Sequence, residues 1–262
     1  MAPTVSGFPR HVLITGASSG IGAALARRFA RPGTYLSLTA RDPAKLQGVA
    51  DLCHAAGADA QWRAVDIAEA KDVGQWITEC DSRRPVELVI ANAGIGGAAV
   101  IVPDTGETVG TAHEIIATNI LGVANTVIPL LPRFVGRGKG HVVIMSSLAA
   151  YVGLPQSPLY SASKAAIRVY GQALRRLVAP RGVRVTIVCP GFVETPMSAS
   201  VDGPRPLIWN VERAAERIAR GIARGEREIS FPWPLATLAR IADALPPRLV
   251  DTLLARTRRS HV

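Results

Sequence analysis

Short apolar runs alternate along the chain with longer stretches in which apolar residues recur every three or four positions. A short continuous apolar run is typical of a strand buried on both faces, and the longer period indicates a helix that covers it. Strands are predicted at 11–15, 34–40, 60–67, 86–94, 141–147 and 183–191. Helices are predicted near 23–30, 45–57, 73–80, 107–134 and 158–179. This alternation predicts an α/β fold whose parallel sheet carries helices on both faces.

The pattern changes beyond the sixth predicted strand. Residues 194–210 are rich in proline, glycine and serine and are not expected to be regular throughout. A helix is predicted at 211–224, followed by the short apolar run EISFPW and by two amphipathic helices that Pro246 and Pro247 separate. No repeat or low-complexity linker interrupts the chain, so residues 1–262 are predicted to form one domain with a C-terminal amphipathic extension at 235–262.

A chain of 262 residues, 48% of them hydrophobic, can bury the core of one large domain. Its three cysteines, Cys53, Cys80 and Cys189, lie far apart, with no CxxC pair and no paired histidines. This spacing argues against a disulfide framework and against a zinc site, so no metal is predicted and a reducing compartment is favoured. We interpret these cysteines, together with His11 and His141, as structural.

Charge and the N-terminal sequence bear on compartment and partners. There is no charged-then-apolar leader and no run of about 18 apolar residues, which predicts a soluble, cytoplasmic protein. The formal net charge is +10, from 30 basic and 20 acidic residues. Only four basic residues are lysines, and the arginines are scattered rather than grouped with aromatic residues. We predict no nucleic-acid partner, although a basic protein attracts polyanionic small molecules.

The segment TGASSGIG (15–22) follows the first predicted strand and opens the first helix. Its glycines, Gly16, Gly20 and Gly22, permit a tight bend and a close approach of the backbone to a ligand. The helix that follows presents free N–H groups and a positive dipole to a phosphate group. Strand, turn and helix together predict a dinucleotide-binding site.

The second predicted strand ends at Ala40, and Arg41 and Asp42 follow it. A carboxylate at this point binds the adenosine ribose of NAD, whereas an arginine accommodates the 2′-phosphate of NADP. Arg41 carries a planar fork of donors that suits a phosphate. NADP(H) is therefore the preferred cofactor, and NAD(H) stays open through Asp42.

Tyr160 and Lys164 stand four residues apart, and Ser147 lies thirteen residues before the tyrosine. Four residues make about one helical turn, so the phenol and the ammonium would project from one face. A nearby positive charge favours the phenolate and lowers the tyrosine pKa from its ordinary value of about 10. The pair predicts an acid–base group that works near neutral pH.

With these features together, the chain resembles the short-chain dehydrogenase/reductase family from near Arg10 to Met197. The family's motifs occur in order: TGASSGIG, VDI with Asp66, ANAG (91–94), TNILG, the Ser-Tyr-Lys set and PGFVETPM (190–197). Ala91 replaces the usual first asparagine of the third motif, for which we expect an effect on stability rather than on catalysis. The resemblance implies a Rossmann-type doubly wound sheet and reversible hydride transfer between a nicotinamide cofactor and a carbonyl or alcohol carbon.

The resemblance also implies roles for single residues. Ser147 would polarise the substrate carbonyl, Tyr160 would exchange the proton, and Lys164 would lower the tyrosine pKa and bind the nicotinamide ribose. Asn119 would support a water relay, which completes a catalytic set of four. Neighbours on a strand point to opposite faces, so only one of Ser146 and Ser147 is expected to reach the site. The family's offset of thirteen residues before the tyrosine selects Ser147.

The cofactor contacts extend beyond the glycine turn. Asp66 is expected to face the adenine amino group. Thr195 is expected to contact the nicotinamide carboxamide or the pyrophosphate, with a helix cap as its alternative role. The predicted cofactor-binding residues are Gly16, Ser18, Ser19, Gly20, Ile21, Gly22, Arg41, Asp66, Ile67, Asn92, Ala93, Gly94, Tyr160, Lys164, Pro190, Gly191, Val193 and Thr195.

Ser147 and Tyr160 are predicted to bind the substrate, with Tyr151 and Leu154 lining the same pocket. Substrate choice is assigned to loop 194–210, the substrate loop, and to the C-terminal extension. The apolar residues that favour a bulky or lipophilic carbonyl compound there are Met197, Leu207, Ile208, Trp209, Phe231 and Trp233.

Other interpretations stay open. One is a non-catalytic NADP(H)-binding regulatory protein. Another is a membrane-peripheral reductase of lipid-like substrates, anchored by the amphipathic end RLVDTLLARTRRS, for which a packed lid or subunit contact is the alternative. The resemblance implies a homodimer or homotetramer built through the helices that carry Asn119 and Tyr160, and an NADP preference favours reduction.

Overall fold

The computed structural model describes residues 8–96, 108–155, 157–200 and 204–258. Within these residues, seven strands form one parallel sheet in the order β3-β2-β1-β4-β5-β6-β7. The strands are β1 (His11–Thr15), β2 (Tyr35–Ala40), β3 (Asp59–Ala64), β4 (Leu88–Ala91), β5 (Gly140–Met145), β6 (Val183–Pro190) and β7 (Glu228–Phe231). The predicted α/β fold of Rossmann type is confirmed. The strand β7 lies in the run EISFPW, which the sequence pattern did not assign to the sheet.

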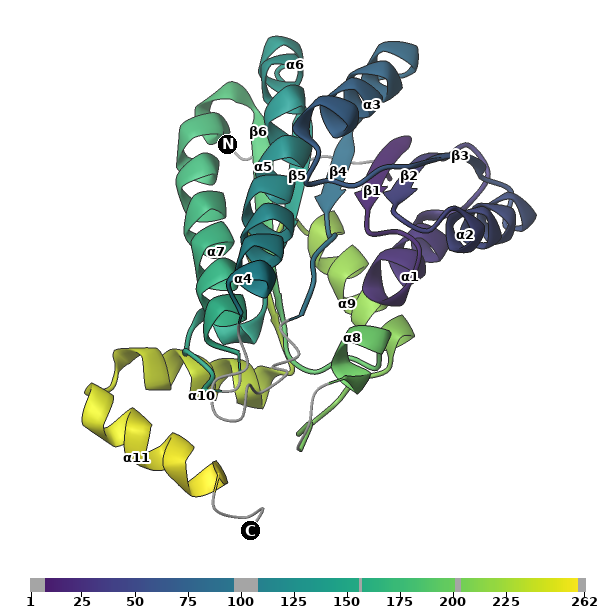
Figure 1. Ribbon diagram of the computed structural model, residues 1–262. Coiled ribbons are helices and arrows are strands. Elements are labelled where there is room, and N and C mark those ends of the chain that lie inside the picture. Colours follow the sequence, from purple (N-terminus) through teal and green to yellow (C-terminus); the bar gives the residue numbers. More distant parts are fainter. Residues whose placement is uncertain (1–7, 97–107, 156, 201–203, 259–262) are drawn as a thin grey trace.

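Helices cover both faces of the sheet (Figure 1). The α-helices are α1 (Gly20–Phe29), α2 (Pro43–Ala55), α3 (Ala70–Arg83), α4 (Val109–Ile116), α5 (Gly122–Val127), α6 (Leu131–Arg137), α7 (Pro158–Val178), α8 (Pro196–Ala199), α9 (Val211–Ala223), α10 (Trp233–Ala244) and α11 (Pro247–Arg258). One face carries α1, α2 and α9, and the other carries α3, α5, α6 and α7. Side chains along β5 point alternately to the two faces of the sheet and pack into both cores. Val143 and Met145 pack on one face, and Val142 and Ile144 pack on the other.

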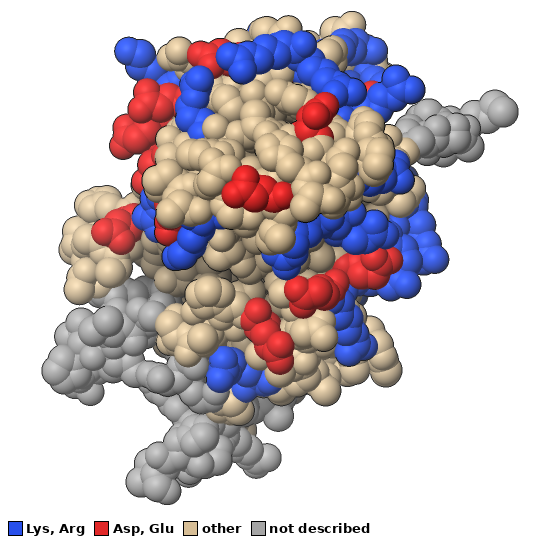
Figure 2. All heavy atoms as spheres, turned by 90° about the vertical axis from the view of Figure 1, so that its right-hand side faces the viewer, with Lys and Arg blue, Asp and Glu red and all other residues tan. Residues whose placement is uncertain are grey.

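Charged side chains of both signs are scattered among uncharged residues on the face shown in Figure 2, where Asp and Glu lie near Lys and Arg. Two surface ion pairs link α1 to α9: Arg27 to Glu212 at 3.2 Å and Arg28 to Glu216 at 2.5 Å. Exposed pairs of this kind contribute little to stability, so the apolar cores hold the two helices together.

The strand order reverses between β1 and β4, because the chain returns from β3 past β1 to begin the other half of the sheet. Ligands of open α/β sheets bind outside the carboxyl ends of the strands at this reversal. The turns that follow β1 and β4 meet there, and they carry TGASSGIG and ANAG. The topology therefore places the predicted cofactor site at the reversal.

The segment Val109–Arg137 is helical throughout and contains the π-helical turn Ala117–Leu121 between α4 and α5. Within the described residues, it is one helix long and apolar enough to cross a membrane by length and composition. This finding does not contradict the prediction that no uninterrupted apolar run of about 18 residues occurs, because polar residues interrupt the helix while leaving it apolar on average. In the fold the helix packs against α3 and α7, as core helices of globular domains do.

The last part of the chain forms the two predicted helices. α10 begins at Trp233, two residues before the predicted start, and α11 begins at Pro247. The prolines separate them as expected, because Pro246 cannot continue the hydrogen-bond pattern of α10. In Figure 1, α10 lies below α7, and α11 extends away from the sheet.

Candidate active site

The turn after β1 can be built only with glycine at two of its positions. Gly16 and Gly20 have φ angles of +65° and +52°, which side-chain-bearing residues rarely adopt. A Cβ at Gly16 would lie 2.7 Å from the Ala93 Cα, and one at Gly22 would lie 2.2 Å from the Gly16 carbonyl oxygen. The turn, the start of α1 and the turn after β4 are therefore in direct backbone contact.

Asn92 ties the two turns together. Its backbone N–H donates to the Thr15 Oγ1 at 3.2 Å, and its side-chain amide donates to the carbonyl oxygens of Thr15 and Gly16 at 3.0 and 3.2 Å. The Asn92 side chain thus holds the glycine turn in shape. In the structure, Asn92 therefore supports the glycine turn. Its contact with the cofactor stays a prediction.

The first turn of α1 fits a pyrophosphate. Ser19 occupies the N-cap, and no side chain in the described part of the chain caps this end. Its first backbone N–H groups and the helix dipole therefore face the space beyond the glycine turn. A Cβ at Gly20 would lie 3.0 Å from the Thr195 Cγ2, so the loop after β6 approaches the same place from the other side. The residues present suit a dinucleotide.

Arg41 and Asp42 follow β2 and have different surroundings. The Arg41 side chain is exposed at the tip of the strand. Asp42 is the N-cap of α2: its Oδ1 accepts the Lys45 backbone N–H at 3.1 Å, and its Oδ2 pairs with the Lys45 ammonium at 3.2 Å. Asp42 is therefore already engaged by its own helix. The turn after β1 reaches this tip, since the Ala17 N–H donates to the Thr39 carbonyl at 3.1 Å.

Asp66 and Ile67 lie beyond β3. The Asp66 Oδ1 accepts the Ala68 backbone N–H at 2.9 Å, which leaves its second oxygen for a ligand. Ile67 is buried, and a Cβ at Gly122 would lie 2.4 Å from its Cδ1. Ile67 therefore packs closely on the helix that carries Asn119.

Asn119 lies in the π-helical turn and is fully buried. Its Oδ1 accepts the Ile95 N–H at 2.8 Å, and its Nδ2 donates to the Ile95 carbonyl at 2.9 Å and to the Ser163 Oγ at 3.0 Å. The widened π turn is often found at functional sites. Here the side chain of Asn119 joins the loop after β4 to α7.

Lys164 is buried on α7, with 4% of its surface exposed. Its ammonium donates to the Met145 carbonyl at 3.1 Å, and a Cβ at Gly94 would lie 3.2 Å from its Nζ. Burial lowers the pKa of Lys164 to about 8. The ammonium is therefore still mostly charged at pH 7 and lies next to the turn after β4.

Ser147 and Ser146 point to different partners, as the strand alternation predicts. The Ser146 hydroxyl is buried and donates to the Lys164 carbonyl at 2.8 Å. Ser147 caps the 3₁₀ turn η3 (Leu148–Ala150), where its Oγ accepts the Ala149 N–H at 3.1 Å, and its hydroxyl is near enough to Tyr160 to lower the pKa of that phenol. The structure thus brings Ser147, Tyr160 and Lys164 together and leaves Ser146 supporting α7.

Tyr160 does not have the predicted low pKa in this structure. Burial raises the pKa of Tyr160, and the hydrogen bond with Ser147 only partly opposes that effect. The predicted lowering by Lys164 is not found, because the lysine ammonium lies 5.6 Å from the centre of the phenol ring and donates to a backbone carbonyl. The phenol is therefore a proton donor at neutral pH.

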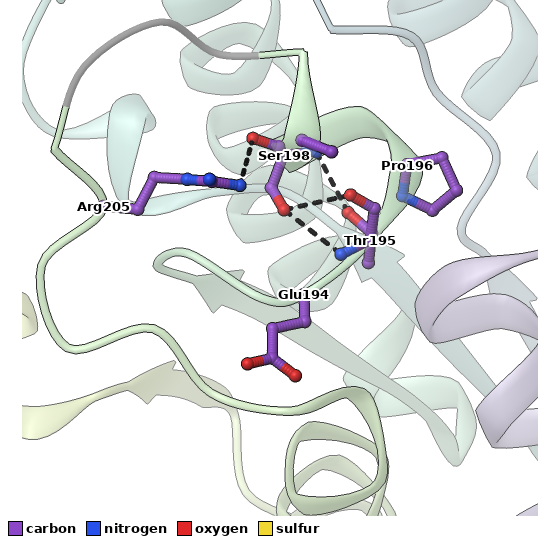
Figure 3. A pocket seen from close by; sticks show the side chains of 6 residues that line it. Glu194, Thr195, Pro196, Ser198 and Arg205 are labelled. Carbon is purple, nitrogen blue, oxygen red and sulfur yellow. Dashed lines mark hydrogen bonds between the residues drawn. The ribbon is translucent and has the colours of Figure 1, made fainter.

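The loop after β6 closes the site. The Gly191 N–H donates to the Phe231 carbonyl at 2.7 Å, and Val193 pairs with Trp209. Thr195 takes the predicted alternative role of helix cap, with its Oγ1 accepting the Ser198 N–H at 3.2 Å at the start of α8. Beside it is a pocket of about 290 Å³, shown in Figure 3, lined by Glu194, Thr195, Pro196, Ser198, Ala199 and Arg205.

The comparisons with known proteins agree with this site. A family model described as short chain dehydrogenase matches residues 10–205. The chain belongs to the short-chain dehydrogenase/reductase family. This dehydrogenase/reductase is 38% identical over 250 residues to an uncharacterized oxidoreductase of Myxococcus xanthus, covering 95% of this chain and 98% of that relative. It is therefore an oxidoreductase that acts on CH–OH groups with NAD(P).

Two solved structures share the fold of this dehydrogenase/reductase. A short-chain dehydrogenase from Sphingobium yanoikuyae, in complex with NADPH, has 28% sequence identity and a TM-score of 0.78, covering 88% of this chain and 93% of that one. The bulky-bulky ketone specific alcohol dehydrogenase from Comamonas testosteroni has 25% identity and a TM-score of 0.76, covering 91% and 95%.

The residues predicted to line the substrate pocket of the dehydrogenase/reductase differ in burial and in partners. Tyr151 is 6% exposed, and its hydroxyl donates to Glu228 Oε1 at 2.5 Å, so the side chain packs against β7; its contact with a substrate stays a prediction. Phe231 is 2% exposed and belongs to the core, and the partly buried Trp209 stacks on it with ring centres 4.8 Å apart. Trp233 is exposed on α10.

The other predicted pocket residues have side chains that are at least partly exposed. Met197 is partly exposed, and a Cβ at Gly96 would lie 2.9 Å from its Cγ, so its side chain lies over the turn after β4. Leu207 is exposed, and Leu154 and Ile208 are partly exposed. Whether they touch a substrate stays a prediction.

Sequence reasoning missed residues that support this site. Ser163 accepts from Asn119 and donates to the Tyr160 carbonyl at 2.7 Å, and Glu228 binds the Tyr151 hydroxyl. The position of Ser163, between Tyr160 and Lys164, was the one available signal. Nothing along the chain links Glu228 to Tyr151, because 77 residues separate them. Among the described residues, no group of three or more His, Cys, Asp or Glu side chains could hold a metal ion.

Proposed function

We propose that this protein is an NADP(H)-dependent reductase of bulky, lipophilic ketones or aldehydes, with Tyr160 as its acid–base group. The observation that carries the proposal is the convergence of Ser147, Tyr160 and Lys164 at the mouth of the glycine turn, with Asn119 bonded to the helix that holds two of them. Each of these side chains has a chemical role that follows from its place.

When bound, the nicotinamide cofactor supplies the hydride that is added to the carbonyl carbon. Ser147 and Tyr160 hydrogen-bond the carbonyl oxygen and orient it. Tyr160 then gives its proton to the oxygen as negative charge develops there. Because burial keeps the pKa of Tyr160 raised, the phenol is protonated at neutral pH, which suits reduction.

Lys164 does not transfer the first proton; it binds the cofactor ribose and stabilises the phenolate of Tyr160. Among the described residues its ammonium has one hydrogen-bond acceptor, the Met145 carbonyl, whereas an ammonium has three donors. The other donors are available to ribose hydroxyls beside Gly94. The charge also stabilises the phenolate that forms after the proton has left Tyr160. Asn119 fixes the loop and helix between which a water relay from Lys164 would run.

The choice of NADP(H) over NAD(H) rests on the tip of β2. Asp42 is engaged as the cap of α2, while Arg41 is exposed and can form charge-assisted hydrogen bonds with a 2′-phosphate. The Sphingobium yanoikuyae structure, which is in complex with NADPH, supports this preference by similarity.

The choice of a bulky substrate rests on the loop after β6. Met197 lies over the turn after β4, and Leu207 is exposed on the same loop. The relative from Comamonas testosteroni is specific for bulky-bulky ketones, which supports the same class here.

A homodimer or homotetramer is proposed through the two helical segments that carry the catalytic residues. Apolar side chains are exposed on both: Leu121 and Ile128 on one, Val169 and Leu177 on α7. Burying such residues in an interface would remove apolar area from water. Light scattering of the purified protein tests this proposal.

The direct test is the change in NADPH absorbance when the purified protein meets a panel of small, bulky and lipid-like ketones and aldehydes. Turnover that rises with the size of the carbonyl substituents supports the proposal. NADPH binding without turnover of any member would favour the non-catalytic regulatory alternative. Sedimentation with anionic vesicles, together with a preference for lipid-like carbonyls, would favour the membrane-peripheral alternative.

A further inference from the structure

Glu228, the first residue of β7, gathers three side chains on one carboxylate. Its Oε1 accepts the Tyr151 hydroxyl at 2.5 Å and the Arg240 Nη2 at 3.1 Å. Its Oε2 lies 3.4 Å from the Arg168 Nε. The Glu228 side chain is 20% exposed, so this is a largely buried meeting point of four elements.

Each partner comes from a different part of the fold. Tyr151 ends the turn η3, which Ser147 caps. Arg168 lies on α7, one turn after Lys164 and two turns after Tyr160. Arg240 lies on α10. The carboxylate of Glu228 therefore connects the turn that carries Ser147 with the helix that carries the other two predicted catalytic residues.

The ring of Tyr151 also has partners, in addition to those of its hydroxyl. The Arg168 guanidinium carbon lies 4.0 Å from the ring centre and that of Arg240 lies 5.5 Å from it, both within the range of a cation–π contact. Ser230 completes the cluster, 3.3 Å from the Tyr151 hydroxyl and 2.9 Å from Arg240. Tyr151 is thus fixed in position by contacts on its edge and on its face.

The charges in this cluster are complementary. Burial raises the pKa of Tyr151 to about 12, so its hydroxyl stays a donor. Burial also raises the pKa of Glu228, but the hydrogen bonds of Tyr151 and Arg240 and the charge of Arg168 outweigh it, and the net pKa is lowered. An ionised carboxylate that accepts two hydrogen bonds, from Tyr151 and Arg240, and pairs with the charge of Arg168 holds a more defined geometry than an apolar contact would.

The turn that carries Ser147 needs such an anchor. Within η3, the Ala150 and Tyr151 N–H groups donate to the carbonyls of Ser147 and Leu148 at 3.1 and 3.2 Å, which shapes the turn itself. The Ser147 hydroxyl reaches the Pro190 carbonyl only at 3.5 Å. On the side before Ser147, the turn is tied to α7 by the Ser146 hydroxyl on the Lys164 carbonyl and by the Lys164 ammonium on the Met145 carbonyl. On the side after Ser147, the Glu228 cluster at Tyr151 supplies a second tie to α7.

We propose that Glu228 is a positioning residue: by holding Tyr151 and Arg168 on one carboxylate, it fixes Ser147 relative to Tyr160. The inference rests on the proposed function, in that Ser147 and Tyr160 act on the same carbonyl oxygen. Arg240 extends the anchor to α10, so the C-terminal part of the chain contributes to the geometry of the site.

The test compares Glu228→Gln and Tyr151→Phe with Glu216→Gln, which removes the same charge from an exposed arginine pair on α9. Displacement by about 1 Å of a reacting group costs up to about 100-fold in rate, so kcat is expected to fall 10- to 100-fold in the first two variants. The KM for NADPH is expected to stay within about twofold, since the cofactor turn is untouched. Glu216→Gln is expected to match the wild type.

The pH profile separates positioning from a general loss of stability. Because the hydrogen bond from Ser147 lowers the pKa of Tyr160, its loss raises that pKa, and the alcohol oxidation profile moves to higher pH. A merely structural role would lower Tm without moving this profile. The proposal is overturned if folded Glu228→Gln and Tyr151→Phe keep the wild-type kcat and profile, or if NADPH affinity falls in step with kcat.

A readout independent of turnover is the crystal structure of each variant. The distance between the Ser147 Oγ and the Tyr160 hydroxyl is expected to lengthen beyond hydrogen-bonding range in Tyr151→Phe and Glu228→Gln, and an unchanged distance overturns the inference. If Glu228→Gln does not fold, Tyr151→Phe carries the test, because it removes one oxygen and keeps the ring. Absence of wild-type turnover on every carbonyl would contradict the proposed function, while the distance would still decide the positioning role.

Discussion

The side-chain amide of Asn119 donates a 3.0 Å hydrogen bond to the hydroxyl of Ser163. Ser163 in turn donates to the Tyr160 carbonyl at 2.7 Å, so a chain of two hydrogen bonds joins the π-helical turn to the first turn of α7. The same asparagine side chain accepts from the Ile95 N–H and donates to the Ile95 carbonyl. One buried amide thereby sets the spacing between a loop and a helix of the site.

We expect Asn119→Ala to lower kcat at least about tenfold and to reduce the free energy of unfolding by about 2–3 kcal/mol, because it leaves the partly buried Ile95 N–H and carbonyl and the buried Ser163 hydroxyl without this partner. Thr126→Val is the matched control on the same continuous helix. It removes a buried hydrogen bond to the Gly122 carbonyl but lies away from the site, so it should cost about 1 kcal/mol and keep kcat. Urea unfolding and steady-state kinetics measure both. Equal losses of kcat in the two variants would contradict the prediction.

Tyr160→Phe should lower kcat by about 10²–10⁴-fold, the usual contribution of a positioned acid–base group, because the ring stays while the proton donor is lost. The Kd for NADPH, from its fluorescence, should change little. Tyr170→Phe removes a hydroxyl farther along α7 and should behave as the wild type. Full turnover of Tyr160→Phe would refute the assignment.

Arg41→Ala should raise the KM for NADPH about 10- to 100-fold, since hydrogen bonds to charged groups contribute about 1.5–3 kcal/mol, and should leave the KM for NADH unchanged. Arg224→Ala, which removes an exposed arginine at the end of α9, controls for the change in net charge. Equal effects on the two cofactors would count against Arg41 as the 2′-phosphate contact.

Gly22→Ala should abolish tight NADPH binding, because the new methyl group would lie 2.2 Å from the Gly16 carbonyl oxygen and 2.5 Å from the Asn92 Nδ2. Gly48→Ala makes the same chemical change on the exposed side of α2, where nothing lies within 4 Å. There the helix should gain about 0.5–1 kcal/mol. Calorimetric titration with NADPH and thermal unfolding of both variants test the pair.

The buried His141 is expected to make the stability of the protein depend on pH. Burial, helped by the charge of Arg184, lowers its pKa to about 3, so the unfolded chain binds a proton that the folded protein does not. Stability is therefore full above the unfolded pKa of about 6.5 and is lost as pH falls towards 3; at pH 5 the loss is about 2 kcal/mol. His11, whose pKa burial lowers to about 4, acts in the same direction.

His141→Gln should make the stability difference between pH 7 and pH 5 smaller by about 2 kcal/mol. His113→Gln, on the exposed side of α4, should retain the wild-type difference. Urea unfolding at the two pH values provides the measurement. If His141→Gln keeps the wild-type stability difference, another group causes the loss of stability at acid pH.

Local patterns predicted much of this protein because their causes are local. Short continuous apolar runs predicted six strands of the sheet, and an apolar period of three to four residues predicted most helices. The offsets within TGASSGIG and between Tyr160 and Lys164 fit one turn and one helix. The choice of Ser147 over Ser146 agrees with the structure for the same reason, since neighbours on a strand face opposite sides.

Long-range contacts decided the rest. Tyr151 was assigned to the pocket from its place after Ser147, but Glu228, 77 residues later, binds its hydroxyl at the sheet edge. Burial, which a spacing cannot reveal, reversed the expected pKa shift of Tyr160. Sequence alone determined which residues share a turn, because backbone geometry acts over a few positions. Only tertiary structure decided which distant groups meet out of water, because hydrogen bonding and desolvation depend on neighbours that folding brings together.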